Sequence, residues 1–360
     1  MRVSVNNIFC WLLVATCFSK SSELFISIGG IGIDLYSYFI MPILFVILLM
    51  HSNEFSLTAV TCMIVFFLYE FSVKLLFGLE LFPLFKQIMP IYLFYSVAFM
   101  AIKRFGVETL FRKYCTLAFY VAVIGIVQYI LELIGVSIFV DAPGRLNSIM
   151  PEASHFAAVI IPAFIFYYLN KSSLLKSFVL GLSVLLTFSS AAILTVLLTI
   201  AIHYRKKLWR AILYTPILLV CVWMLYLNVE EFSYRINDVL SFLWGADIYE
   251  SNATTFSFFS NLLPSFYSFT STFGLGSGLG GHPEVYLRYW NQVDPSFINF
   301  RLFGLNMISG HSLGVRIVSE LGVLGLLGLL YVFMKLFFSL NNIPTKSTEY
   351  SILLASSSSL

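Results

Sequence analysis

A histidine, an arginine and a glutamate stand at the mouth of the last long apolar run of the chain. Residues 310–328 read GHSLGVRIVSELGVLGLLG and contain His311, Arg316 and Glu320. An ionisable side chain near the bilayer centre costs roughly 2.5–3.5 kcal/mol, so these charges need a polar pocket, a shallow depth or each other. Arg316 and Glu320 are four residues apart and share a helix face, where they can pair. Ser312 can cap the start of the same helix.

A second polar segment precedes another apolar run. Residues 141–156 read DAPGRLNSIMPEASHF and contain Arg145, Glu152 and His155. Pro151 and Glu152 suit the first turn of a helix, where a carboxylate complements the helix dipole. Glu152 and His155 share a helix face, and such a pair can ligate a metal ion. Because the pair stands alone and the other acidic residues are scattered, we predict no metal site.

The elements that position these residues follow from composition. The chain is 59% hydrophobic and only 11% charged, and its mean hydropathy is +0.90. These values are far from those of a soluble domain and predict an integral membrane protein. The net charge of +3 reflects membrane topology, and we predict no nucleic-acid partner.

Apolar runs near the length of a membrane span recur along the chain. We predict spans at 6–27, 35–51, 56–77, 87–102, 114–135, 155–170, 174–188, 190–204, 211–228 and 312–334. The seventh and eighth form one apolar stretch that is broken at Phe188-Ser189-Ser190; the alternative is one span plus a re-entrant piece. A last run at 350–360 is too short to span and is either a truncated eleventh span or a tail. The predicted fold is therefore all-α and polytopic, with about 10–11 transmembrane helices.

The basic residues predict the orientation and the domain organisation. With the N-terminus inside, most of the 21 Lys and Arg residues fall on the cytoplasmic side. The chain then divides into nine transmembrane helices over 1–228, with a short periplasmic segment at 138–154. A large periplasmic loop follows over 229–311, and the tenth helix and the tail occupy 312–360.

Some arginines fall outside against this bias, namely Arg145, Arg235, Arg288, Arg301 and Arg316. The planar guanidinium suits phosphate, so an outer group of arginines is a candidate binding site for an anion. The alternative is that they are ordinary loop residues or pair with nearby acids.

The outer loop is rich in aromatic residues, which stack on sugar rings and also occupy membrane interfaces; both uses stay open. Its stretch 274–281, GLGSGLGG, matches GxGxxG. Because no βαβ pattern surrounds the match, we interpret it as a flexible turn against the membrane surface.

Together these features resemble the Wzy-type O-antigen polymerases and the related O-antigen ligases. The likeness rests on PEASHFA at 151–157, the Ser-Ser-Ala interruption at 189–191, the large outer loop, and the helix from His311-Ser312 to ELGVLG at 320–325. It implies an all-helical glycosyltransferase of the bacterial inner membrane, acting at the periplasmic face without a metal or other cofactor. The implied substrate is an undecaprenyl-diphosphate-linked oligosaccharide held in membrane lipid, and a chain-length regulator is a further implied partner.

The resemblance also implies roles for residues. His311 would lie near the acceptor hydroxyl, with Glu152 as a second catalytic residue. The diphosphate would be bound by Arg145 and Arg316, and also by Arg288 and Arg301. Glu320 and His155 would support the site.

Two other functions stay open. The spacing from His311-Ser312 to Gly322 and Gly325 also fits the ligases, which transfer glycan to a lipid A-core acceptor, but the segment RLNSIMPEASH favours the polymerase. A glycolipid transporter or flippase would share the hydropathy and the outer arginines. Such proteins tend to contain internal repeats, and we find none here, which favours an enzyme.

Overall fold

The structure is a computed structural model of the full chain. It describes residues 5–19, 25–28, 31–34, 39–51, 57–136, 144–150, 152–205, 216, 220, 223–224, 226–227, 230–244, 253–293, 302–310, 312–345 and 347–358.

The chain packs as two units. Unit 1 comprises Met1–Glu54, Tyr95–Val222 and Leu336–Leu360, and unit 2 comprises Phe55–Phe94 and Trp223–Lys335. Helices α4 (Phe82–Phe105) and α14 (Gly322–Asn342) have residues in both. These units follow packing, whereas the division predicted at 228 and 311 follows membrane topology and stays a prediction.

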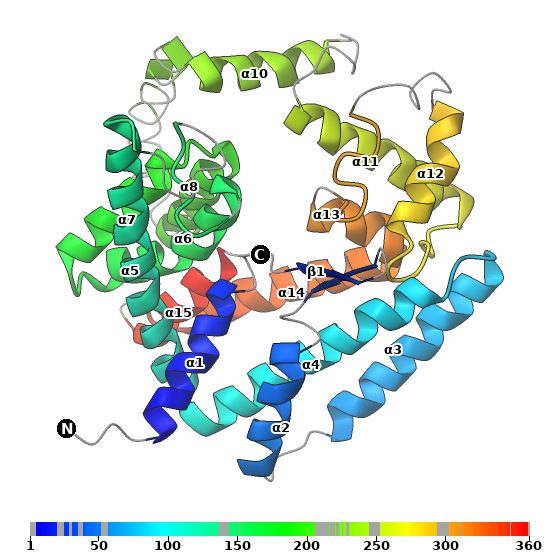
Figure 1. Ribbon diagram of the computed structural model, residues 1–360, viewed down its shortest axis with the longest axis horizontal. Helices are drawn as coiled ribbons and strands as arrows, with labels where there is room; N and C mark the ends of the chain where they lie inside the picture. Colours follow the sequence, from blue (N-terminus) through cyan, green and yellow to red (C-terminus); the bar gives the residue numbers. More distant parts are fainter. Residues whose placement is uncertain are drawn as a thin grey trace. The chain divides into compact units, whose positions relative to one another are not determined.

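Unit 1 is built on helix α6. Its elements are α1 (Val5–Ser19), β1 (Phe25–Ile28), β2 (Ile31–Asp34), α2 (Met41–His51), the end of α4, α5 (Val107–Leu133), α6 (Ala153–Asn170), α7 (Leu174–Leu186), α8 (Ser190–Tyr204), the end of α14 and α15 (Thr348–Ser357). Helix α6 packs against α5, α7, α8 and α15, a cluster visible in Figure 1. Its sequence is apolar on every face, as expected of a helix surrounded by others. Phe156, Ile160 and Ala163 are completely buried in this core.

Unit 2 holds the whole of the predicted outer loop, 229–311. Its elements are α3 (Leu57–Leu76), the first part of α4, α10 (Glu230–Leu243), α11 (Ala253–Ser271), α12 (His282–Val293), α13 (Leu313–Arg316), the π-helical turn η6 (Ile317–Leu321) and most of α14. Helices α11 and α12 lie side by side, and both contact η6. The segment 229–311 therefore contains three helices among its described residues rather than an extended loop.

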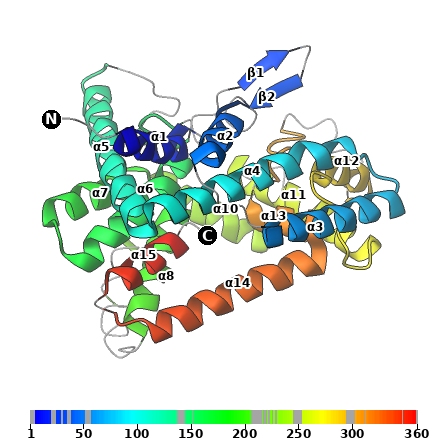
Figure 2. The same cartoon turned by 90° about the horizontal axis from the view of Figure 1, so that it is seen from below.

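The predicted apolar runs fall on helices. Those at 6–27, 35–51, 56–77, 87–102 and 114–135 correspond to α1 to α5, and those at 155–170, 174–188, 190–204 and 312–334 to α6, α7, α8 and the continuous α13–η6–α14. The run at 211–228 lies mostly outside the described residues. Within the described ranges, four helices are long and apolar enough to cross a membrane, and the last of them, Leu313–Asn342, is only 6% buried over its most apolar window; α14 is the long helix of Figure 2. The fold is that of a membrane-embedded helical protein, while the number of spans stays a prediction.

Three local features bear on the sequence predictions. The break at 188–190 is confirmed, because α7 ends at Leu186 and Phe188 has a φ of 48°. The all-α prediction is confirmed for the described residues, apart from one short antiparallel pairing of β1 with β2. The last run, 350–360, contributes to α15, whose Tyr350 and Leu354 are completely buried against other helices of unit 1. Its described part, up to Ser357, therefore belongs to a packed helix.

Candidate functional site

The polar residues of unit 2 gather around η6. Ser312 is the N-cap of α13, and its hydroxyl accepts a hydrogen bond from Val315 N at 3.2 Å, so the predicted cap is confirmed. The chain then passes through the π-helical turn and enters α14 at Gly322, which has a φ of 58°. Single π-helical turns within longer helices occur frequently at functional sites.

The glycine-rich stretch 274–281 braces this turn. Ser277 N donates to Ser319 O at 2.8 Å, Gly278 N donates to Glu320 O at 2.9 Å, and Val323 N donates to Gly274 O at 2.8 Å. Glycine is required here, because a Cβ on Gly276 would meet the Glu320 carbonyl and lie 2.8 Å from Gly322 N. The predicted flexible turn at the membrane surface is wrong, since this stretch is largely buried within unit 2.

Arg316 and Glu320 form the predicted ion pair. Arg316 Nη2 lies 2.9 Å from both carboxylate oxygens of Glu320, and Nε lies 3.2 Å from Oε1. Nη2 also donates to Gln87 Oε1 at 2.7 Å. The Glu320 side chain is only 3% exposed, whereas that of Arg316 is 28% exposed. Nη1 makes no hydrogen bond to any described residue, so the fork is oriented from one side and retains donors for an anion.

A buried histidine that the sequence did not single out lies beside this pair. His282 is completely buried. Its Nδ1 lies 2.9 Å from Ser319 Oγ on η6, and its Nε2 lies 2.9 Å from Asn261 Oδ1 on α11. Burial, with a smaller contribution from the Arg316 charge, lowers the pKa of His282 to about 4. The imidazole is therefore neutral at neutral pH.

This lowered pKa predicts acid destabilisation. In the unfolded chain His282 takes up a proton below its ordinary pKa near 6.5, whereas in the folded protein it resists protonation until about pH 4. Stability present above pH 6.5 should thus be lost progressively down to pH 4, by about 3 kcal/mol in total. Unfolding temperatures in detergent micelles between pH 7 and pH 4 measure it. His282→Asn should flatten this acid slope, and an identical slope in the variant would contradict the assignment.

Helix α3 adds two buried ionisable residues to the same region. Lys74 is completely buried and Glu70 is 1% exposed. Leu279 N donates to Glu70 Oε2 at 2.8 Å, and a Cβ on Gly278 would lie 2.8 Å from Lys74 Cγ. No described residue forms a hydrogen bond with Lys74 Nζ. The spacing of Glu70 and Lys74 within an apolar run was a sequence signal for this pair, since charges inside predicted spans are functional candidates.

Arg288 lies in the same unit but in a different environment. On α12, its Nη2 lies 3.0 Å from Glu284 Oε1, with side-chain exposures of 42% and 29%. Glu284 also accepts a hydrogen bond from Glu80 N at 3.1 Å. An exposed pair of this kind is worth about 0–1 kcal/mol, so its guanidinium can change partner at little cost.

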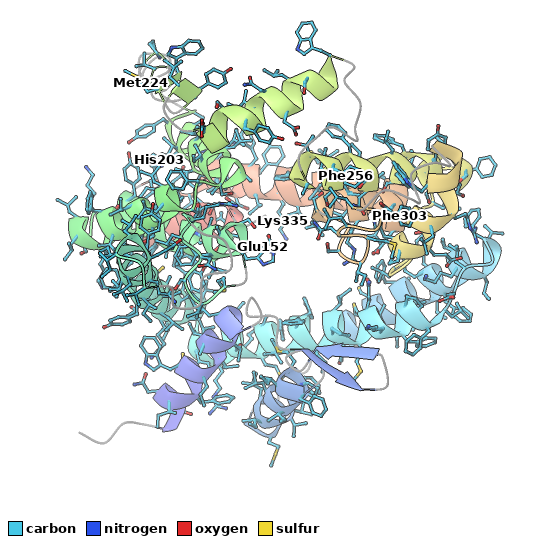
Figure 3. All side chains as sticks on the ribbon, turned by 45° about the horizontal axis from the view of Figure 1, so that its top comes forward. Glu152, His203, Met224, Phe256, Phe303 and Lys335 are labelled. Carbon is cyan, nitrogen blue, oxygen red and sulfur yellow. The ribbon has the colours of Figure 1, made fainter. Side chains whose placement is uncertain are left out.

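The other predicted site residues that the structure describes belong to unit 1. Arg145 is half-buried and its Nε donates to Thr187 O, at the end of α7, at 3.0 Å. Glu152 is the N-cap residue of α6 (Figure 3), but its side chain makes no capping bond and instead accepts from Ser154 Oγ at 2.9 Å. Glu152 and His155 are both exposed. The structure thus brings together Arg316 and Glu320, and it places Arg145, Glu152 and His155 in the other unit.

Arg301 and His311 lie outside the described residues. Gly310, the residue before His311, is described. Gly310 has a φ of 67°, and a Cβ there would lie 2.5 Å from Arg316 Cγ. The chain leading to His311 therefore runs directly against the Arg316 side chain.

Comparison of the chain with family models, curated proteins and solved structures finds no match. The function is therefore inferred from the residues of this chain.

The aromatic residues of the outer segment have a structural use that the sequence did not indicate. Phe256, Tyr286 and Trp290 form a buried cluster, against which Phe303 packs, and Figure 3 shows Phe256 and Phe303 in this unit. The Tyr286 and Trp290 rings are stacked at 5.9 Å. These rings are core rather than sugar platforms, whereas Phe266 and Tyr267 are 54% and 44% exposed.

The described residues include no group of three or more His, Cys, Asp or Glu side chains suited to a metal ion. Arg288 and Arg316 of unit 2 are instead ion-paired with Glu284 and Glu320, and guanidinium groups bind anions through charge-assisted hydrogen bonds.

Proposed function

We propose that the chain is a surface-polysaccharide polymerase of the O-antigen type. It joins undecaprenyl-diphosphate-linked oligosaccharide repeat units at the periplasmic face of the bacterial inner membrane, as a glycosyltransferase without a metal ion. The observation that supports this most is Arg316: a guanidinium oriented by Glu320 and Gln87, directly before the π-helical turn η6 and near the start of a span-length apolar helix.

The reaction assigns a task to each group. A hydroxyl oxygen of the acceptor sugar attacks the anomeric carbon of the donor, and the bond from that carbon to the diphosphate oxygen breaks. The hydroxyl proton passes to His311, and undecaprenyl diphosphate leaves with its added charge held by Arg316. Charge-assisted hydrogen bonds aimed at a leaving group make some of the largest contributions to catalysis. Arg145, Arg288 and Arg301 are proposed as further diphosphate contacts, Glu152 as the alternative base and His155 as its neighbour.

The role of His311 as the general base can be tested by substitution. His311→Ala should leave protein level and lipid-diphosphate binding largely intact while transfer falls by about two orders of magnitude or more, the scale expected for loss of a general base. Rates of glycan lengthening by purified protein measure it. Transfer at the normal rate, or joint loss of binding and folding, would move the role to Glu152.

Membrane orientation follows from the distribution of Lys and Arg, and it can be tested on exposed positions. In a cysteine-free background, Phe273→Cys, at a side chain that is 90% exposed, should react with an impermeant maleimide in intact spheroplasts. Val107→Cys, which is 49% exposed, should react only after lysis. The reverse pattern would place the proposed site in the cytoplasm and remove its substrate.

A ligase remains the second candidate because the spacing from His311-Ser312 to Gly322 and Gly325 also fits that branch. One assay separates the candidates. Purified protein in vesicles receives a lipid-linked oligosaccharide, with or without a lipid A-core acceptor. A polymerase yields longer lipid-linked glycans without the second acceptor, a ligase yields product only on the lipid A-core, and a flippase moves the lipid without forming any new glycosidic bond.

A further inference from the structure

The orientation of the Asn261 side chain fixes the hydrogen-bond roles around His282. Asn261 Nδ2 donates to Ser257 O at 2.7 Å and to Leu305 O at 3.1 Å. Carbonyl oxygens only accept, so the amide nitrogen must face them and Oδ1 must face the imidazole. Oδ1 in turn only accepts, and His282 Nε2, 2.9 Å away, must carry a proton.

The other ring nitrogen is then an acceptor. A neutral imidazole protonated at Nε2 presents a lone pair at Nδ1. Ser319 Oγ lies 2.9 Å from Nδ1 and 3.3 Å from Arg316 O, and it donates its proton to the nearer acceptor, Nδ1. His282 thus links a donor on η6 to an acceptor on α11, and each bond requires this one tautomer.

The bridge joins the two segments that carry the proposed chemistry. Through Asn261 it reaches Leu305, in the stretch 302–310 that leads directly to His311. Through Ser319 it reaches the turn between Arg316 and Glu320. Gly310 packs closely against both side chains, because a Cβ there would lie 3.3 Å from His282 Cδ2 and 2.5 Å from Arg316 Cγ.

We propose that His282 is a positioning residue for glycan transfer, holding the η6 turn, which directly follows Arg316, in register with the segment that precedes His311. This inference rests on the proposed function. His282 is completely buried and does not touch substrate; it acts through Ser319 and Asn261. A misplacement of about 1 Å between catalytic groups can lower a rate by about a hundredfold. The hydrogen bonds of His282 therefore affect the rate by fixing the relative positions of η6 and the segment before His311.

The test compares kcat and KM for lengthening of a lipid-linked oligosaccharide. His282→Leu should lower kcat by about tenfold or more, while KM changes less than about twofold, because the Arg316–Glu320 pair is intact. Ser319→Ala, which removes only the hydroxyl donor, should lower kcat in the same direction. The double variant should be no slower than His282→Leu alone, since both changes remove the same bond.

Two further variants separate positioning from folding. His282→Asn can place an acceptor near the position of Nδ1, and it should recover part of the kcat lost in His282→Leu. Tyr289→Phe is the matched control, because it removes another hydrogen bond between α11 and α12, the 2.6 Å contact of Tyr289 with Ser271 Oγ; its kcat should be unchanged.

Each outcome has one reading. Normal kcat in Ser319→Ala and His282→Asn, a rise in KM alone, or an equal loss in Tyr289→Phe would overturn the inference while wild-type protein remains active. Should His282→Leu not fold, Ser319→Ala and His282→Asn decide the matter. Wild-type protein that lengthens no glycan would instead overturn the proposed function.

Discussion

Arg316→Ala is expected to abolish glycan transfer and to destabilise the protein by about 3 kcal/mol, because removing one partner of a buried pair leaves an uncompensated charge. That charge is Glu320, whose side chain is 3% exposed. Arg316→Lys keeps the positive charge but loses the planar fork, so it should retain part of the activity. Transfer rates and unfolding temperatures at matched protein levels measure both effects.

A second substitution separates stability from catalysis. In Arg316→Ala/Glu320→Gln the buried carboxylate is replaced by a neutral amide, so most of the lost stability should return while transfer stays absent. Recovery of transfer in this double variant would show that Arg316 serves only to neutralise Glu320. Arg288→Ala is the control for stability, because its pair with Glu284 is exposed and should cost about 1 kcal/mol or less.

Gly276→Ala is expected to have the second largest effect, because it displaces η6, the turn that directly follows Arg316 and carries its partner Glu320. Gly276 has a φ of 81°, and its new Cβ would lie 2.7 Å from the Glu320 carbonyl carbon, which is backbone and cannot rotate away. We expect a loss of stability about 2 kcal/mol beyond that of a glycine strained only by its φ, and loss of transfer with it. Chemical or thermal unfolding in micelles measures the first effect.

Gly304 supplies the matched control for Gly276. Its φ of 78° is nearly the same, but no described atom lies within 4 Å of the position that a Cβ would take. Gly304→Ala should therefore cost only the strain of the left-handed backbone, about 1–2 kcal/mol. Equal losses in the two variants would mean that the contact between the glycine-rich stretch and η6 does not hold the turn in place.

Local features of the fold were predictable from the sequence because their causes are local. The apolar runs set the helices, Ser312 capped its helix as its type predicts, and Arg316 paired with Glu320 through helix spacing alone. The break at Phe188 followed from an apolar stretch too long for one span.

Contacts between distant segments could not be predicted in this way. Gln87 reaches Arg316 across 229 positions of the chain, and Glu70 reaches Leu279 across 209. His282 gave no signal, since a lone histidine has no periodicity and its partners come from two other elements. The glycine-rich stretch was misinterpreted for the same reason. Gly276 is required because the η6 backbone packs against it, and that contact cannot be predicted from the neighbouring residues in the sequence.

The most direct test of the central claim is the release of undecaprenyl diphosphate during glycan lengthening. Purified protein in vesicles is given a lipid-linked oligosaccharide, and released lipid diphosphate is counted against new glycosidic bonds. The proposed reaction predicts one released for each bond formed in the wild type, and neither in Arg316→Ala/Glu320→Gln. Movement of the lipid without release, or full release and lengthening in that double variant, would contradict it.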